Sequence, residues 1–319
     1  MPLSNTPESP QNITIIGCPI DKGAGRAGCS MGPTALRIAG LSEALSDLGH
    51  KVTDQGDLTI AHAANATADV TLAGNTKNAA SVAGFVRAIE ATAFDAVAQG
   101  SFPIFLGGDH SLSMGSVSGI ARHAAQTGRP QFVLWLDAHT DFNTPHTSPS
   151  GNMHGMPVAF FCGEEGFDGI LPPARPIVDP RHVHMFGIRS IDTIERDLVL
   201  ARGVHVHDMR AIDEHGISRL MRGLIDKVRA ANGLLHVSVD ADFLDPSIAP
   251  GVGTPVSGGA TFREAHLVME LLHESGLVSS LDLVETNPYL DNRGETSRLM
   301  VDLTASLFGR KTLPYTEAP

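Results

Sequence analysis

Cysteine is scarce in this sequence, and its spacing points to no cross-linked framework. The chain has three cysteines, Cys18, Cys29 and Cys162, and no two of them are separated by only two residues. An odd, sparse set of this kind excludes a disulfide scaffold. A chain of 319 residues can also bury a core large enough to fold without cross-links. We therefore expect reduced thiols and a cytoplasmic protein.

Positive charge and long apolar runs are also lacking. The chain has 23 Lys and Arg against 35 Asp and Glu, a formal net charge of −12. Because phosphate groups and anionic membranes bind basic faces, this balance disfavours nucleic acid and membrane surfaces as partners. No run approaches the roughly 18 apolar residues that span a bilayer. Residues 1–11 are polar, without the apolar core of a signal peptide, and we expect a flexible N-terminus there.

The overall composition is that of a packed globule. Hydrophobic residues make up 42% of the chain and charged residues 18%, which excludes a disordered acidic chain. Length alone would allow about two domains. However, no internal repeat and no linker rich in Pro or Gly divides the sequence. We therefore expect one domain over residues 1–319.

Short apolar runs alternate with helical patterns along the whole chain. The runs are continuous rather than alternating, as expected for strands covered on both faces. Helical patterns occupy residues 81–99, 217–231 and 261–275, and the last opens with Thr261 and Glu264 at capping-box spacing. This order predicts an α/β fold, a three-layer α/β/α sandwich with a mostly parallel central sheet. The predicted strands are residues 13–16, 103–106, 132–136, 183–188, 204–207, 234–239 and 278–284.

Four of these predicted strands lead into polar clusters. Functional residues of parallel sheets collect just beyond the carboxyl ends of the strands. The clusters read Gly-Gly-Asp-His at 107–110, Asp-Ala-His-Thr-Asp at 137–141, Asp-Ala-Asp at 240–242 and Glu-Thr-Asn at 285–287. We therefore expect the chemistry of the protein at this edge of the sheet.

Two of the clusters have the spacing of metal ligands. Asp137, His139 and Asp141 alternate after one strand, and Asp240 and Asp242 alternate after another. Alternate side chains of an extended segment lie on one side of the backbone. Four carboxylates in one crevice repel one another, and two divalent cations cancel their charge. Oxygen ligands with some imidazole suit Mn²⁺ or a similar metal. The predicted ligands are His110, Asp137, His139, Asp141, Asp240 and Asp242.

A purely structural interpretation exists for each residue alone. A single Asp after a strand usually caps a helix or closes a turn, and a lone histidine there is usually structural too. Two acidic pairs and a histidine on three separate strand ends favour the metal interpretation instead. Two neighbouring metal ions commonly bridge a water and lower its pKa towards neutrality. The sequence therefore predicts metal-assisted hydrolysis.

The motifs as a set resemble the ureohydrolases and, within them, the arginases. They are Gly-Gly-Asp-His-Ser at 107–111, Asp-Ala-His-Thr-Asp at 137–141 and Ser-Val-Asp-Ala-Asp at 238–242. The resemblance extends from Gly17 to about Phe308. It implies two Mn²⁺ ions per subunit and a homo-oligomer, either a trimer or a hexamer. It also implies hydrolysis of L-arginine to L-ornithine and urea by a hydroxide that bridges the two ions.

The resemblance also implies a role for each ligand and each catalytic residue. Asp141 relays a proton to the leaving amine, Glu285 orients the guanidinium group, and His154 shuttles protons. An unperturbed histidine pKa near ~6.5 suits that task. One implied ion is held by His110, Asp137, Asp141 and Asp240, and the other by Asp137, His139, Asp240 and Asp242.

Substrate recognition is implied for the loop at residues 143–152. In the arginases this loop accommodates the α-carboxylate through neutral donors, whereas Asp192 faces the α-ammonium group and Glu195 assists. Agmatine lacks the carboxylate and would leave those donors unpaired, which favours arginine as the substrate. The implied substrate-binding residues are Asn143, Ser148, Ser150, Asn152, Asp192, Glu195 and Thr254.

Two alternative functions stay open. One is a related guanidino- or amidino-hydrolase of the agmatinase or guanidinobutyrase type. The other is a non-catalytic sensor that binds a guanidino ligand in the same pocket, although a complete set of candidate ligands weighs against it.

Several other patterns are given structural interpretations. Residues 23–28 spell Gly-x-Gly-x-x-Gly, the dinucleotide-binding pattern, but the next helix is expected to begin at Pro33, after the last glycine. We therefore expect a loop near the mouth of the site. His236 lies within a predicted strand and is expected to be a hydrogen-bonded core residue, and Trp135 is expected to pack in the core. The pairs His182/His184 and His205/His207 are expected to be sheet or surface residues.

Overall fold

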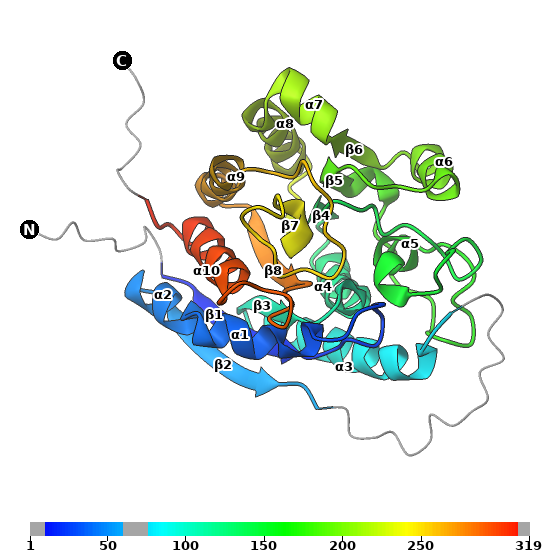
Figure 1. Ribbon diagram of the computed structural model, residues 1–319, viewed down its shortest axis with the longest axis horizontal. Coiled ribbons are helices and arrows are strands. Elements are labelled where there is room, and N and C mark those ends of the chain that lie inside the picture. Colours follow the sequence, from blue (N-terminus) through cyan, green and yellow to red (C-terminus); the bar gives the residue numbers. More distant parts are fainter. Residues whose placement is uncertain (1–9, 60–75, 312–319) are drawn as a thin grey trace, which may run out of the picture.

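The computed structural model describes residues 10–59 and 76–311 (Figure 1). Most of the N-terminal segment expected to be flexible, residues 1–9, therefore lies outside the described part of the chain. Cys18, Cys29 and Cys162 are all buried free thiols, as the sequence predicts. No helix in the described ranges combines the length and apolar character that crossing a membrane requires.

The described residues form one eight-stranded sheet in which every strand pair is parallel. The strand order is β2-β1-β3-β8-β7-β4-β5-β6. This architecture confirms the predicted α/β/α sandwich around a parallel sheet. The strands are β1 Asn12–Cys18, β2 Lys51–Asp57, β3 Phe102–Gly107, β4 Gln131–Leu136, β5 Val183–Ile188, β6 His205–Asp208, β7 Leu234–Asp240 and β8 Val278–Val284.

Seven of these strands coincide with the predicted apolar runs, and the sequence analysis missed β2. Strands such as β3 and β4 are buried at every position, because helices cover both faces of the sheet. In contrast, β2 lies at the edge of the sheet and reads Lys-Val-Thr-Asp-Gln-Gly-Asp, with no fully buried residue. An exposed edge strand needs no continuous apolar run, so its sequence carries no such signal.

Helices cover the two faces of the sheet as two separate layers. One layer packs α1, α2, α7, α8, α9 and α10 against the sheet, and the other packs α3, α4, α5 and α6. Figure 1 shows α8, α9 and α10 on one side of the sheet and α3, α4 and α5 on the other. The helices are α1 Gly32–Ile38, α2 Leu41–Asp47, α3 Ala79–Ala98, α4 Ser113–Gln126, α5 Pro157–Phe161, α6 Thr193–Arg202, α7 Met209–His215, α8 Ile217–Ala230, α9 Phe262–Ser275 and α10 Glu295–Leu307.

The three long helical patterns match α3, α8 and α9. The capping box predicted for α9 is present, with Thr261 accepting from the Glu264 N–H and the Glu264 carboxylate accepting from the Thr261 N–H. The helix predicted to begin at Pro33 begins one residue earlier, at Gly32, which places proline in the first turn where its missing N–H costs nothing. Residues 21–28 form a loop, so the dinucleotide-binding interpretation is excluded.

The strand order explains where the site forms. Strands β3, β8, β7 and β4 are consecutive neighbours in the middle of the sheet, although they come from distant parts of the chain. The sheet order changes direction between β3 and β4, and such a switch point opens a crevice at the carboxyl ends of the strands. The four polar clusters that the sequence shows are the segments that follow these four strands.

Candidate metal centre and substrate pocket

Each central strand delivers a different side chain to the same crevice. His110 begins the short 3₁₀ helix His110–Leu112 after β3, and Asp137 follows β4 directly. Asp240 ends β7 and caps the 3₁₀ turn Ala241–Phe243, and Glu285 follows β8. All four side chains are at most 3% exposed. They are therefore fixed by the sheet, with little freedom to turn towards solvent.

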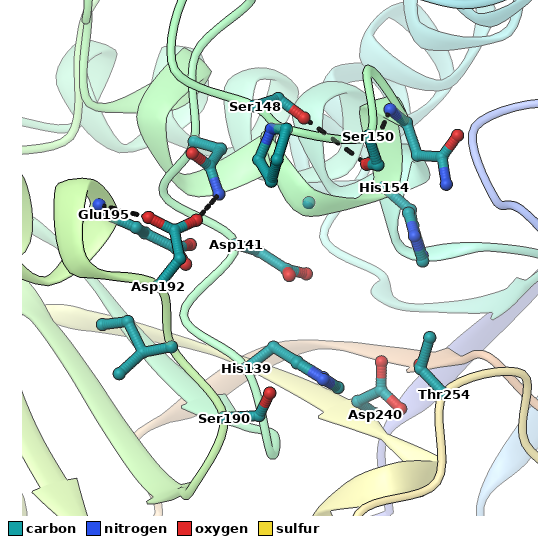
Figure 2. Close-up of a pocket in the computed structure, with 15 residues that line it drawn as sticks. His139, Asp141, Ser148, Ser150, His154, Ser190, Asp192, Glu195, Asp240 and Thr254 are labelled. Carbon is teal, nitrogen blue, oxygen red and sulfur yellow. Dashed lines mark hydrogen bonds between the residues drawn. The ribbon is translucent and has the colours of Figure 1, made fainter.

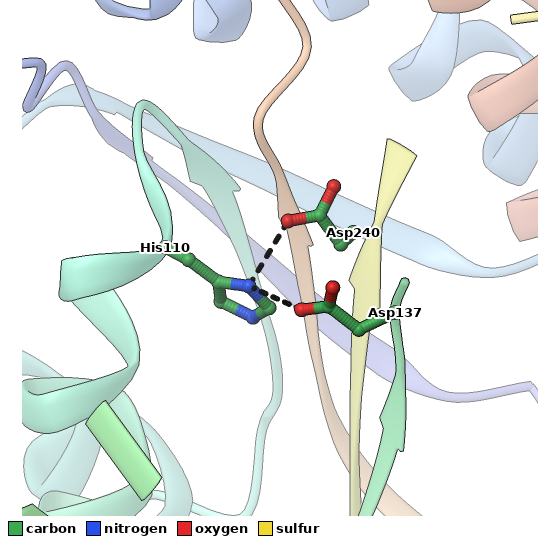
Figure 3. Close-up of side chains that lie close together, drawn as sticks. All are labelled: His110, Asp137 and Asp240. Carbon is green, nitrogen blue, oxygen red and sulfur yellow. Dashed lines mark ion pairs between the residues drawn. The ribbon is translucent and has the colours of Figure 1, made fainter. Parts of the chain in front are cut away.

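Three carboxylates point at one nitrogen of His110. The His110 Nδ1 atom lies 3.0 Å from Asp137 Oδ2, 3.1 Å from Asp240 Oδ2 and 3.2 Å from Asp141 Oδ2. Figure 3 shows the first two carboxylates converging on the imidazole ring from neighbouring strands. The structure thus brings together four of the six predicted ligands in one cluster.

This cluster has the features of a cation site. One ring nitrogen carries at most one hydrogen, so it cannot donate to three carboxylates at once. His110 Nδ1 and Asp137 Oδ2 are in fact buried without a hydrogen-bond partner. Two ligand atoms at right angles around a cation, each about 2.1 Å from it, lie about 3.0 Å apart. The observed spacing of 3.0–3.2 Å between nitrogen and oxygen fits donors that share a metal ion.

A second group of ligand atoms adjoins the first and shares Asp137 with it. His139 Nδ1 lies 3.2 Å from Asp242 Oδ2 and 3.4 Å from Asp137 Oδ1. Thr254 Oγ1 donates to Asp242 Oδ2 over 3.1 Å and fixes that carboxylate from the far side. His110, Asp137 and Asp240 form one group able to hold an ion, and Asp137, His139 and Asp242 form another. The six predicted ligands therefore meet in one continuous cluster.

The electrostatics of the cluster also fit a bound cation. Burial raises the pKa of Asp240 and Asp242 above the usual range, and the neighbouring carboxylates raise it further. Burial, with a contribution from Asp137, raises the pKa of Asp141 to about 6. Four carboxylates this close resist ionising together unless positive charge lies between them. Two divalent ions would supply that charge.

A buried pair of His154 and Glu285 stands beside the cluster. His154 Nδ1 lies 2.9 Å from Glu285 Oε1, which also accepts from the His110 N–H over 3.0 Å. Cys29 Sγ lies 3.4 Å from the other oxygen, Oε2, and donates to it. Although burial disfavours a charged ring, the Glu285 carboxylate raises the pKa of His154 to about 9. His154 therefore carries a positive charge at neutral pH.

The backbone is left-handed at two of these residues. Asp141 has φ 48° and Glu285 has φ 58°, and both are among the few non-glycine residues with positive φ in the described segments. This conformation is unfavourable for a residue with a side chain. It persists here because the surrounding contacts fix both residues, and such strain commonly marks functional sites.

A cavity of about 220 Å³ opens above the cluster. Figure 2 shows His139 and Asp240 on one wall, Ser148 and Ser150 opposite, Asp141 between them, and Asp192 and Glu195 at the side. All seven predicted substrate-binding residues line this cavity, whereas Glu285 does not and lies behind His154. The lining residues are His139, Asp141, Asn143, Ser148, Pro149, Ser150, Asn152, His154, Gly155, Ser190, Ile191, Asp192, Glu195, Asp240 and Thr254.

Hydrogen bonds fix the acidic side of the cavity. Asp192 caps α6 by accepting from the Glu195 N–H over 2.9 Å, and its other oxygen accepts from Asn143 Nδ2 over 3.0 Å. Glu195 Oε1 accepts from the Phe142 N–H over 2.7 Å, and burial raises the pKa of this carboxyl to about 7. Loop 143–152 and the start of α6 are thus joined through Asn143 and Asp192.

Comparison with known proteins decides the family. The sequence pattern of the arginase family matches residues 11–309 of this chain. The arginase of Brucella melitensis is 55% identical over 305 residues, which cover 94% of this chain and 96% of that protein. The chain belongs to the arginase family.

Solved structures of the family agree with the fold described above. The arginase of Bacillus cereus superposes with a TM-score of 0.86 at 38% identity, covering 95% of this chain and 100% of the other. The arginase of Entamoeba histolytica, solved in complex with L-ornithine, superposes with a TM-score of 0.83 at 26% identity, with the same coverage. Family membership makes this chain an arginase-type hydrolase, as the sequence predicts.

Asp109 is a site residue to which the sequence analysis gave no role. It is fully buried, and its Oδ2 atom accepts from the N–H groups of Gly23 (2.8 Å) and Ala24 (3.1 Å). A Cβ at Gly23 would lie 2.7 Å from Asp109 Oδ1, so this close approach requires glycine. The loop also contacts the wall of the cavity, because the N–H of His154, which lines it, donates to the Gly23 carbonyl. The sequence signal for Asp109 was its place beside His110 in the Gly-Gly-Asp-His-Ser motif at 107–111.

The histidines that the sequence analysis interpreted as structural, and the tryptophan, occupy structural positions. His236 is fully buried, with Nδ1 2.9 Å from Ser280 Oγ. The rings of His184 and His205 stack across β5 and β6 with centroids 4.3 Å apart. Trp135 is fully buried and also supports the site, because its ring stacks on His110 at 3.9 Å and 5°. The imidazole of His110, a predicted ligand, is therefore packed against an indole ring.

Proposed function

We propose that this chain is a dimanganese hydrolase that cleaves the guanidinium group of L-arginine to L-ornithine and urea. The observation that carries the proposal is the six-residue ligand cluster beneath a cavity lined by carboxylates and neutral polar groups. Relatives named arginase, one of them 55% identical, support the same substrate.

The proposed ligands suit two Mn²⁺ ions. Carboxylate oxygens and imidazole nitrogens, without any thiolate, are the donors that manganese and similar metals prefer. Bound here, the ions would supply an activated water at neutral pH and would offset the negative charge of the cluster. We assign one ion to His110, Asp137, Asp141 and Asp240, and the other to Asp137, His139, Asp240 and Asp242.

The residues around the cluster fit a cationic substrate. Asp141, Asp192, Glu195 and Asp240 line the cavity, and their oxygens attract a guanidinium group and an ammonium group. A planar cation that reaches the metal centre lies close to Asp141, whose Oδ atoms are placed to accept a proton and pass it to the leaving amine.

His154 is the second proposed proton carrier. Its ring lines the cavity and is protonated at neutral pH, so it can deliver a proton from the cavity wall. Glu285 holds Nδ1 of this ring from behind. We therefore propose that Glu285 acts on the guanidinium through its negative charge and through the orientation of His154.

The polar end of the cavity supports arginine over agmatine. Ser148, Ser150, Asn143 and Asn152 line the cavity and can offer neutral donors to an α-carboxylate, and we propose that Asp192, on the same cavity, holds the α-ammonium group. A substrate without the carboxylate leaves these groups unpaired. A site built to pair a polar group rejects an analogue that lacks it, here by at least about a hundredfold.

A urea-release assay tests the proposal. Protein loaded with Mn²⁺ is given L-arginine, agmatine or 4-guanidinobutyrate, and the kcat/KM values are compared. We expect arginine to be preferred by at least about a hundredfold. A preference for agmatine or guanidinobutyrate would contradict the assignment of loop 143–152. Binding of arginine without urea release would show a sensor rather than an enzyme.

We further propose that residues 1–319 act as one catalytic domain, that the protein functions in the cytoplasm, and that it is a trimer or a hexamer. The family resemblance supports these assignments. Light scattering on the purified protein should give three or six times the chain mass of 33.6 kDa. A monomeric mass would contradict the oligomer.

A further inference from the structure

A line of buried polar side chains runs from His110 into the protein, away from the cavity. His110 Nε2 lies 2.8 Å from Ser238 Oγ, and Ser238 Oγ lies 3.5 Å from Ser113 Oγ. Ser113 Oγ in turn donates to Asp282 Oδ2 over 2.7 Å. These side chains come from β7, α4 and β8, and none of the three lines the cavity. The line therefore joins a proposed metal ligand to a carboxylate behind the site.

The carboxylate at the end of this line fixes the direction of its hydrogen bonds. Ser113 gives its single hydroxyl hydrogen to Asp282 Oδ2. Ser113 can then only accept from Ser238, whose Oγ lies 3.5 Å away, at the outer limit of a hydrogen bond. A Ser238 hydroxyl that donates to Ser113 accepts from the ring, so the His110 Nε2–H points at Ser238 Oγ, 2.8 Å away. This leaves the lone pair of Nδ1 facing Asp137, Asp141 and Asp240, as metal ligation requires.

Further contacts hold Asp282 in its place. Its Oδ2 atom also accepts from Ser116 Oγ over 2.7 Å and lies 3.1 Å from His236 Nε2. The side chains of Asp282, His236, Ser113 and Ser116 are all fully buried. A carboxylate without access to water is stabilised only by such donors. Two serine hydroxyls therefore donate to this oxygen, and the His236 ring lies beside it.

We propose that Asp282 is a positioning residue that acts through Ser113 and Ser238 to hold His110 with Nδ1 free for metal. It touches neither substrate nor metal. The proposal rests on the proposed function only in taking His110 as a metal ligand. It predicts that breaking the line weakens metal binding even though every ligand remains.

Two serines of α4 allow a matched test. Ser113 and Ser116 are both fully buried, and both donate to Asp282 Oδ2 over 2.7 Å, but only Ser113 continues towards His110. The Mn²⁺ affinities of metal-stripped wild type, Ser113→Ala and Ser116→Ala are measured by calorimetry. We expect at least about a tenfold loss for Ser113→Ala and less than about a twofold loss for Ser116→Ala.

Additional readouts separate positioning from general destabilisation. The two variants should lose similar stability in metal-free thermal unfolding, because each deletes one equivalent hydroxyl. At saturating Mn²⁺, Ser113→Ala should regain most of the wild-type kcat with an unchanged KM. Ser113→Thr, which restores a hydroxyl at this position, should restore the affinity for Mn²⁺. Equal Mn²⁺ affinities for the two alanine variants would overturn the inference. If wild type itself bound no Mn²⁺, or released no urea, the proposed function would fail instead.

Discussion

At the scale of single residues, the site depends on side chains whose charge is set by their neighbours. His154 and Glu285 illustrate this, because a buried imidazole alone would lose its proton and a buried carboxylate alone would gain one. Together they form a pair, 2.9 Å apart, in which the pKa of His154 is about 9 and that of Glu285 is lowered by the His154 charge despite burial. The contacts of Glu285 with His154 and the His110 N–H accompany a left-handed backbone, with φ 58°.

This pair predicts a pH dependence of stability in the metal-free protein. Because the pKa of His154 is about 9 in the folded chain and near ~6.5 when unfolded, the pair stabilises the fold fully below about pH 6.5. That contribution is lost as the pH rises through about 9, and its size is on the order of 1–3 kcal/mol. Glu285→Gln should abolish this loss, as measured by denaturant unfolding across the same range.

The control for this prediction is Cys29→Ser. This variant changes the donor to the other oxygen of Glu285 but leaves the carboxylate charge intact. It should keep the wild-type decline in stability between pH 6.5 and about 9. The account of the pair would be wrong if Glu285→Gln declined over that range as steeply as wild type does.

At the scale of elements, the residue that caps α6 is also a proposed substrate-binding residue. Asp192 caps α6 and at the same time faces the cavity. Asparagine caps helices about as well as aspartate but carries no charge. The substitution Asp192→Asn therefore separates the two tasks.

For Asp192→Asn we expect the KM for L-arginine to rise about tenfold and kcat to stay within about twofold of wild type. The free energy of unfolding should stay within about 0.5 kcal/mol of the wild-type value. Steady-state kinetics and denaturant unfolding measure these values. The matched control is Asp208→Asn, which changes the cap of α7, where Asp208 accepts from the Ala211 N–H over 2.8 Å, away from the cavity. A raised KM in the control, or none in Asp192→Asn, would remove Asp192 from substrate recognition.

Elements with a continuous apolar signal could be predicted from the sequence, and others could not. Strands such as β4 are apolar at nearly every position because helices cover both faces of the sheet. The capping-box residues that begin α9 can be recognised directly in the sequence. Strand β2 is polar because it forms the edge of the sheet, so only tertiary pairing with β1 makes it a strand. The strand that pairs with β2 lies elsewhere in the sequence, and no local sequence rule reveals this pairing.

At the scale of the whole molecule, the sheet order assembles the site. The sequence shows which strands end in polar residues, but it does not show that β3, β8, β7 and β4 lie side by side. The motif resemblance supplied that arrangement indirectly, through the roles expected of His110 and Asp137. The line from His110 to Asp282 was beyond prediction, because it crosses α4, β7 and β8, and its serines have no distinctive spacing.

The central claim is that two manganese ions share the six-residue cluster, and anomalous diffraction at the manganese edge tests it most directly. Crystals grown with Mn²⁺ should show two peaks per chain. One should lie among His110, Asp137, Asp141 and Asp240, and the other among Asp137, His139, Asp240 and Asp242. A single peak, or peaks outside these residues, would contradict the account.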